Sequence, residues 1–250
     1  MDHRRFRAII FDLGNTLIYF DADWSQVFPQ ADKALLSSLR DSGLALDGAF
    51  GDAFRDRLES YYREREMEFI EYTTRYVLES LLRDWGYENV SDEVVRLALS
   101  KLHSVSQAHW QPEDDMLTTL SDLKAKNYRL GMISNAGDDA DVQALIDKAE
   151  IRPFFDIILT SAAQGIRKPN PEIFMMVLDY WKFLPTEVVM VGDTLGADIL
   201  GAKNAGIFNI WITRRANRPA NLAHQETIFP DEQITKLSEL PVLLEDLSVQ

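Results

Sequence analysis

The amino-acid sequence predicts an α/β protein, a Rossmann-like, doubly wound parallel sheet with an inserted α-helical domain. Two observations lead to this prediction. Five short apolar runs each end in a polar residue, and the last four alternate with amphipathic segments, which is typical of parallel strands joined by helices. A long stretch after the first run repeats apolar residues only at helical spacing, which indicates an insertion.

The strands are expected where apolar residues run without alternation, because the strands of a parallel sheet are buried on both faces. Each run is short and ends in Asp, Ser or Thr, which places a polar side chain at the carboxyl end of the strand. The predicted strands are residues 6–12, 128–134, 155–161, 188–193 and 208–213.

Helices are predicted between the last four strands, over residues 138–149, 171–183 and 196–205. In "NPEIFMMVLDYW", Asn170 is the expected N-cap and Pro171 the expected first helical residue. Gly206 is expected to close the third helix as its C-terminal cap. In such a sheet, ligands bind at the carboxyl ends of the strands, and this is where chemistry is expected.

Residues 20–108 are predicted to form the helical insertion, and residues 1–19 with 109–250 the sheet domain. Segments such as "FIEYTTRYVLESLLRDW" have apolar residues at helical spacing and no comparable strand. Several aromatic residues in this stretch are pocket candidates, although aromatic stripes more often pack helix against helix. They are Tyr61, Tyr62, Tyr72 and Trp85.

Composition limits the classes of function. The chain has 250 residues, 46% of them hydrophobic, and a formal net charge of -14, which argues against a surface that neutralises nucleic-acid phosphates. It contains no cysteine, so disulfides and thiolate nucleophiles are excluded. The N-terminal apolar run is too short for a signal peptide, and no run has membrane-spanning length. We therefore expect a cytoplasmic protein whose partner is a small molecule rather than nucleic acid or membrane.

Asp12, in "AIIFDLGNTLI", ends the first predicted strand as a bare carboxylate. Such a carboxylate can act as a nucleophile if a cation screens its charge and a phosphoryl group is held in line with it. Ser134 and Asn135, in "ISNAG", end the neighbouring strand and are candidates to hold the phosphoryl oxygens.

Lys168, in "GIRKPNPEIF", precedes a helix and is a candidate to neutralise charge on the nucleophile and on the transferring group. Asp193 and Asp198 are five residues apart in "VGDTLGADI". The first suits a hard cation, which prefers oxygen ligands, and the second suits an anchor for Lys168. Each element alone has an ordinary explanation as a cap or turn, but the ordered set of four favours a phosphoryl-transfer site.

Together these four motifs resemble those of the haloacid dehalogenase-like (HAD) superfamily, and the insertion resembles that family's C1-type cap. The resemblance implies a Rossmann-like core, a mobile helical cap and Mg²⁺-dependent phosphoryl transfer through an aspartyl-phosphate. The implied roles are Asp12 as nucleophile and metal ligand, Thr16 as a supporting residue, Ser134 and Asn135 as phosphate binders, Lys168 as charge stabiliser, the Gly14 carbonyl and Asp193 as metal ligands, and Asp198 as a partner of Lys168 or of metal-bound water.

Gly14 departs from the family pattern. Family phosphatases usually carry a second Asp two residues after the nucleophile, which protonates the leaving group and then activates water. Glycine retains the backbone carbonyl for the metal but has no acid, and the loss of a general acid costs about 10² to 10⁴ in rate for leaving groups that need a proton. We therefore expect a phosphatase for stable leaving groups or one with a borrowed proton donor, and Asp21 and Asp23 are candidates.

Other functions remain open. A 2-haloacid dehalogenase also lacks the second Asp, because halide leaves without a proton, but it has no need for the carboxylate of Asp193. A non-catalytic phospho-ligand binder or regulatory protein on the same scaffold would not need the nucleophile. A receiver-type domain is about half this length and lacks the insertion.

Arg214, Arg215 and Arg218 could steer an anionic substrate, although a solvated loop is the simpler interpretation. The four histidines have no metal-ligand spacing and are expected to be structural or exposed; they are His3, His103, His109 and His224.

Overall fold

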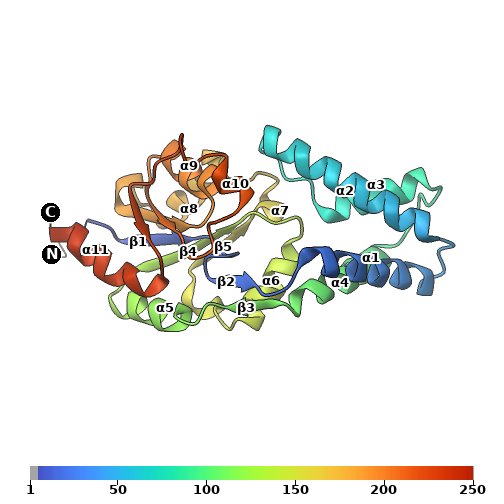
Figure 1. Cartoon of the computed structure of the whole chain (residues 1–250), viewed down its shortest axis with the longest axis horizontal. Helices are drawn as coiled ribbons and strands as arrows, with labels where there is room; N and C mark the ends of the chain where they lie inside the picture. The colour runs from blue at the N-terminus through green and yellow to red at the C-terminus, as the bar shows by residue number, and fades with distance from the viewer. Residues whose placement is uncertain (1–4, 250) are drawn as a thin grey trace.

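The computed structural model describes residues 5–249 and confirms the predicted fold class (Figure 1). Its centre is a six-stranded sheet in which all hydrogen-bonded neighbours run parallel. All five predicted strands are present, and a sixth, β8, was not predicted. In sheet order the strands are β5 (Ile157–Thr160), β4 (Arg129–Ser134), β1 (Ala8–Phe11), β6 (Val188–Gly192), β7 (Phe208–Ile212) and β8 (Glu232–Ile234).

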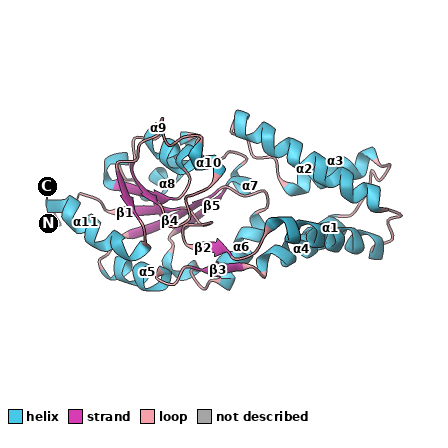
Figure 2. Cartoon of the chain, in the orientation of Figure 1, coloured by secondary structure: helices cyan, strands magenta, loops and turns pink. Residues whose placement is uncertain are grey.

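Helices cover both faces of the sheet (Figure 2). Alternate residues of β1 point to opposite faces, so that Ile9 and Phe11 join one core and Ala8 and Ile10 the other. The first core includes α5 (Met116–Ala125), α6 (Asp139–Lys148) and α11 (Leu240–Val249), and the second includes α8 (Pro171–Trp181) and α9 (Leu200–Asn204).

The three helices predicted between strands are confirmed with small differences. Residues 138–149 become α6 and residues 171–183 become α8, whose N-cap Asn170 accepts a hydrogen bond from the Glu172 amide. Residues 196–205 form a π-helical turn, Leu195–Ile199, followed by α9. Gly206 follows α9 with a φ of +71°, as its role at the helix end requires.

Most of the predicted insertion is four helices, which extend away from the sheet (Figure 1). They bury a core of their own, because each helix has one apolar face turned toward the others. The domain boundaries themselves remain predictions. The four helices are α1 (Trp24–Asp41), α2 (Gly48–Glu68), α3 (Thr74–Asp84) and α4 (Asp92–Gln107).

The chain enters and leaves the helical part through a small antiparallel ribbon of β2 (Ile18–Phe20) and β3 (Trp110–Pro112). Phe20 pairs with Trp110 at the end of the ribbon nearest the helices. These two strands were not predicted from the sequence. Their pairing places the entry and exit of the insertion side by side.

A second contact joins the helical part to the sheet domain through the segment between α2 and α3. The Glu71 amide donates to the Gly165 carbonyl at 3.0 Å, and the Thr74 amide donates to the Gly137 carbonyl at 2.8 Å. The Ser161 hydroxyl donates to Glu71 Oε2 at 2.7 Å in a buried position. The helical part is therefore held to the loops that follow β4 and β5.

The remaining helical segments are short. Among the residues that the structure describes, no helix combines the length and the apolar character that crossing a membrane requires. The short segments are α7 (Ser161–Gln164), α10 (Pro219–Leu222) and the 3₁₀ turns Arg152–Phe154, Pro185–Glu187 and Leu237–Glu239.

Candidate active site

Asp12 directly follows β1 in the middle of the sheet, between β4 and β6. The strand ends here because the chain turns, with Asn15 in the left-handed region at a φ of +57° and its amide bonded to the Ile18 carbonyl. Since the neighbouring strands are parallel, the ends of β4 and β6 bring Ser134 and Asp193 to the same edge. The predicted strand-end residues therefore meet at one place.

Lys168 lies at the centre of this edge with a side chain that is only 1% exposed. Its Nζ is 2.7 Å from Asp12 Oδ1, 2.6 Å from Asp198 Oδ1 and 2.7 Å from the Ile133 carbonyl oxygen. This arrangement matches the predicted contact between Lys168 and Asp198. The ammonium thus bridges two buried carboxylates.

Asn135 holds the backbone of Lys168. Its side-chain amide donates to the Lys168 carbonyl, and its side-chain oxygen accepts from the Lys168 amide, both at 2.9 Å. Asn135 was predicted to bind phosphate through the backbone at this strand end, and its side chain is engaged in positioning the lysine. Ser134 is 6% exposed and lines the cavity beside Asp12.

Asp193 and Asp198 are both buried at the end of β6. Asp198 accepts a hydrogen bond from the Thr194 amide at 2.9 Å, and Gly192 has no room for a side chain, because a Cβ there would overlap the Asp198 carboxyl group. The Asp193 carbonyl accepts from the indole of Trp211 at 2.9 Å. These contacts fix the loop that carries both carboxylates.

Arg218 forms an ion pair with the Asp193 carboxylate and donates to the Thr194 hydroxyl at 2.9 Å. Arg215 pairs with Glu113 and lies over the Tyr19 ring, with 3.6 Å from its guanidinium carbon to the ring centroid. The arginine-rich loop is therefore not simply solvated, as the sequence analysis preferred, but is bound to Asp193 and to the β2–β3 ribbon.

Burial and crowding of like charges perturb the acidic groups. Burial raises the pKa of Asp12 to about 6, although the Lys168 ammonium opposes the shift. Burial, together with the charge of Asp12, raises the pKa of Asp193 to about 8, and Arg218 opposes this shift. Burial alone would lower the pKa of Lys168, but Asp12 and Asp198 outweigh it and raise that pKa. Each of these shifts follows from carboxylates held close together out of water.

The carboxylates of Asp12, Asp193 and Asp198 fit a divalent cation. One oxygen from each lies within 4.8 Å of the others, and all three residues are buried. Hard oxygen ligands of this kind suit Mg²⁺, and a further positive charge would offset the burial and the repulsion that together raise the pKa values of Asp12 and Asp193. Thr16 is fully buried in the turn after Asp12, and the Gly14 backbone lines the cavity.

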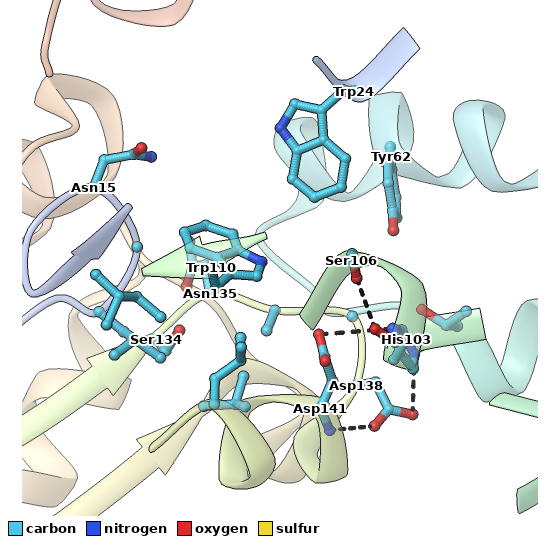
Figure 3. Close-up of a pocket in the computed structure, with 18 of the residues that line it drawn as sticks. Asn15, Trp24, Tyr62, His103, Ser106, Trp110, Ser134, Asn135, Asp138 and Asp141 are labelled. Atoms are coloured by element: carbon cyan, nitrogen blue, oxygen red, sulfur yellow. Dashed lines mark hydrogen bonds and ion pairs between the residues drawn. The ribbon is translucent and has the colours of Figure 1, made fainter. Parts of the chain in front are cut away.

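A cavity of about 470 Å³ extends from these residues toward the helical part. Figure 3 shows Trp24 and Trp110 between Asn15 and Ser134 on one side and Tyr62 and His103 on the other. His103 lies near two carboxylates, with 3.8 Å from its Nε2 to Asp138 and 3.6 Å from its Nδ1 to Asp141. The cavity therefore has a charged end at the sheet and an aromatic middle.

The proton-donor candidates have other contacts. Asp23 caps α1 by accepting from the Ser25 amide, and Asp21 faces His109 at 3.5 Å. Neither aspartate is among the residues that line the cavity. His3 lies outside the described residues, and His224 packs beside Gly196. The structure thus brings neither aspartate to the place where an acid is missing.

Of the four aromatic candidates in the helical part, Tyr62 lines the cavity. Tyr61 and Tyr72 pack against each other with ring centroids 5.0 Å apart, and Trp85 packs against Phe50 at 5.3 Å. Packing was the expected role for most of them. Trp24 and Trp110, which do line the cavity, could not be singled out from the sequence, because they stand at the junctions of strands and helices, where no periodicity marks them.

Comparison with known proteins agrees with this geometry. Residues 6–206 match the family model for haloacid dehalogenase-like hydrolases. The chain is 28% identical to the glyceraldehyde 3-phosphate phosphatase of Pyrococcus furiosus over 97% of this chain and 94% of that protein. It is 33% identical to the glyceraldehyde 3-phosphate phosphatase of Methanothermobacter thermautotrophicus, over 82% of this chain and 85% of that protein. Among solved structures, a 2-haloacid dehalogenase from Pseudomonas syringae superposes with a TM-score of 0.66 at 26% identity. The match covers 97% of this chain and 99% of that protein.

Proposed function

The chain belongs to the haloacid dehalogenase-like hydrolases, and from this premise we propose that it is a phosphatase for small phosphorylated metabolites, with Asp12 as its nucleophile. The observation that supports the proposal most is the buried cluster in which Lys168 bridges Asp12 and Asp198 beside Asp193. The phosphatase names of two relatives that align over most of the chain agree with it.

In this proposal, Mg²⁺ is held by the carboxylates of Asp12 and Asp193 and by the Gly14 carbonyl. The ion supplies positive charge that lets a carboxylate and a phosphate dianion approach each other. Asp198 is engaged by Lys168 and the Thr194 amide, which suits a partner that orients the lysine.

The protein groups then divide the work of transfer. A carboxylate oxygen of Asp12 attacks phosphorus as the bond to the leaving oxygen breaks, and the leaving group departs with the electron pair. Lys168 and Ser134 stabilise the charge on the phosphoryl oxygens. Water then attacks the phosphorus of the aspartyl-phosphate, which releases phosphate and restores Asp12. We assign residues 20–108 the role of a C1-type cap that excludes bulk water from the first step.

A phosphate-release assay tests this proposal. Wild-type protein and Asp12→Asn are compared with and without Mg²⁺ on an aryl, an acyl and several alkyl phosphates. We expect release that needs both Mg²⁺ and Asp12 and that favours the activated leaving groups, because Gly14 offers no acid. Failure to release phosphate from any of them would refute the proposal.

A second candidate is a 2-haloacid dehalogenase, which the likeness to the Pseudomonas syringae enzyme and the absence of an acid at Gly14 both favour. In that reaction Asp12 would attack carbon and displace halide, which needs no proton. Chloride release from 2-chloropropionate that persists in EDTA and in Asp193→Asn would support the dehalogenase and exclude the phosphatase.

A further inference from the structure

A wall of aromatic rings borders the cavity next to the acidic cluster. This aromatic wall consists of Phe20, Trp24, Phe28 and Trp110, and the last three line the cavity. Phe20 stacks on Trp24 with centroids 3.7 Å apart and planes at 5°, and Trp24 stacks on Phe28 at 4.9 Å. Trp110 meets Trp24 edge to face at 6.3 Å (Figure 3). The mutual stacking holds the rings as a fixed surface rather than as separate mobile side chains.

The wall reaches the position where the family's second aspartate would stand. A Cβ placed on Gly14 would lie 3.4 Å from Cη2 and 3.7 Å from Cζ3 of Trp110. A carboxylate added beyond that Cβ would compete with the indole for space beside the nucleophile. The residue that would protonate a leaving group is thus absent, and an apolar ring borders its place.

The charged groups farther along the cavity face one another. Arg55 pairs with Asp32 and lies over the Phe28 ring, 5.0 Å from its centroid. At the other side, two carboxylates, Asp138 and Asp141, share the single imidazole of His103. Because these groups already pair with one another, an uncharged ring would lie against the wall without leaving any of them unpaired.

We infer that the aromatic wall is a leaving-group subsite and that the preferred substrates are phosphate monoesters of planar aromatic alcohols. This inference rests on the proposed phosphatase function. The bond between an Asp12 oxygen and phosphorus forms as the bond to the aryl oxygen breaks, and the electron pair stays on the aryloxide. The aryloxide is stable enough to leave without a proton from the protein, and it takes one from water afterwards. Its ring gains stacking contacts with Trp24 and Trp110.

The test separates ring stacking from leaving-group acidity. The kcat/KM of wild-type protein is measured on phenyl phosphate and on hexafluoroisopropyl phosphate, whose alcohol has similar acidity but no ring. One aromatic contact contributes about 0.5–1.5 kcal/mol, so we expect phenyl phosphate to be favoured by about two- to tenfold. Equal kcat/KM values for the two esters, or a preference for the fluoroalkyl ester, would overturn the subsite.

Variants locate the subsite. Trp24→Ala is expected to lower kcat/KM for phenyl phosphate by about three- to tenfold and to change the value for the fluoroalkyl ester by less than about twofold. Trp85→Ala is the matched control, because Trp85 is 39% exposed, Trp24 is 38% exposed, and Trp85 does not line the cavity. If Trp24→Ala does not fold, Trp24→Leu, which removes the ring and keeps apolar volume, is measured instead. Equal losses on both esters would show a structural role and would overturn the subsite.

A double variant tests the position of Trp110. Gly14→Asp with Trp110→Ala is expected to hydrolyse alkyl phosphates at least about tenfold faster than Gly14→Asp alone, since the added acid then has room. No difference between these two variants would refute the claim that the indole competes with an acid at position 14 for space. If wild-type protein releases phosphate without preferring the ester with a ring, only the subsite is refuted. If wild-type protein releases no phosphate from any ester, the proposed function is refuted.

Discussion

Replacing Asp193 by asparagine is expected to stabilise the protein in EDTA while it abolishes Mg²⁺ binding. The Asp193 carboxyl is buried close to Asp12, and its pKa is raised from 3.8 to about 8. A raised carboxyl pKa means that the folded protein holds this proton more tightly than the unfolded chain. The contribution to stability is therefore complete below about pH 4 and is lost as the pH rises toward 8.

The magnitude follows from the shift. Each pKa unit corresponds to about 1.4 kcal/mol. At pH 7 the unfolded chain releases the Asp193 proton that the folded protein retains, and this lowers the free energy of unfolding by about 4 kcal/mol. Asparagine removes that cost but also weakens the contacts with Arg218 and Thr194, which contribute about 1–3 kcal/mol. We expect a net gain of about 2 kcal/mol, which raises Tm by about 4–8 °C in a chain of this size.

Thermal unfolding in EDTA between pH 5 and pH 8 measures this effect. The gain of Asp193→Asn should be largest at pH 8 and should nearly vanish at pH 5, and added Mg²⁺ should raise the Tm of the wild type but not that of the variant. Asp246→Asn, on the exposed face of α11, is the matched control and should show neither effect. A variant that is less stable than the wild type at pH 8 would refute the reasoning.

Three further predictions concern the contacts around the cluster. Lys168→Met leaves two buried carboxylates without their shared cation, so unfolding in urea should show a loss of about 3–5 kcal/mol, against little change for the half-exposed Lys203→Met. Gly192→Ala forces a methyl group against Asp198 and should cost about 1–3 kcal/mol in the same assay. Glu71→Ala removes the acceptor of a buried hydroxyl and should cost about 1–3 kcal/mol and speed amide exchange in residues 69–74.

Each of the three has an outcome that would contradict it. Equal stability of Lys168→Met and the wild type would mean that the carboxylates are protonated when the lysine is present. If Gly192→Ala leaves the free energy of unfolding unchanged, the loop after β6 moves easily to make room for the methyl group. Unchanged exchange in Glu71→Ala would mean that the backbone hydrogen bonds alone hold the helical part to the loops.

The sheet and its strand-end residues could be predicted because they depend on short-range pattern. A buried parallel strand needs an uninterrupted apolar run, and a polar residue such as Asp12 at its end marks the place where the chain leaves the core. The strands that were missed have three residues each and mixed burial, as in β2 and β8. Such short segments show no period, and they become strands only because a partner lies beside them.

The contacts of the site that were missed join residues distant in sequence. Arg218 lies 25 positions after Asp193 in the chain, and no spacing rule connects a loop arginine to a strand-end carboxylate. Trp110 lies beside Gly14 only because β3 pairs with β2 and returns the chain from the helices. The glycine that departs from the family pattern could be seen in the sequence, but the ring next to it could not.

The β2–β3 ribbon has a consequence for how the chain folds. Bringing Ile18–Phe20 to Trp110–Pro112 closes a loop of about ninety residues, and the chain entropy lost in that closure is about 4 kcal/mol, more than two such short strands gain by pairing. The helices at the two ends of that loop, α1 and α4, pack against a shared core. If the helices assemble first, they bring the ends of the loop together and the ribbon pairs at little further entropic cost. The helical part would then form as an early folding unit, and Trp110 would reach Gly14 only after it.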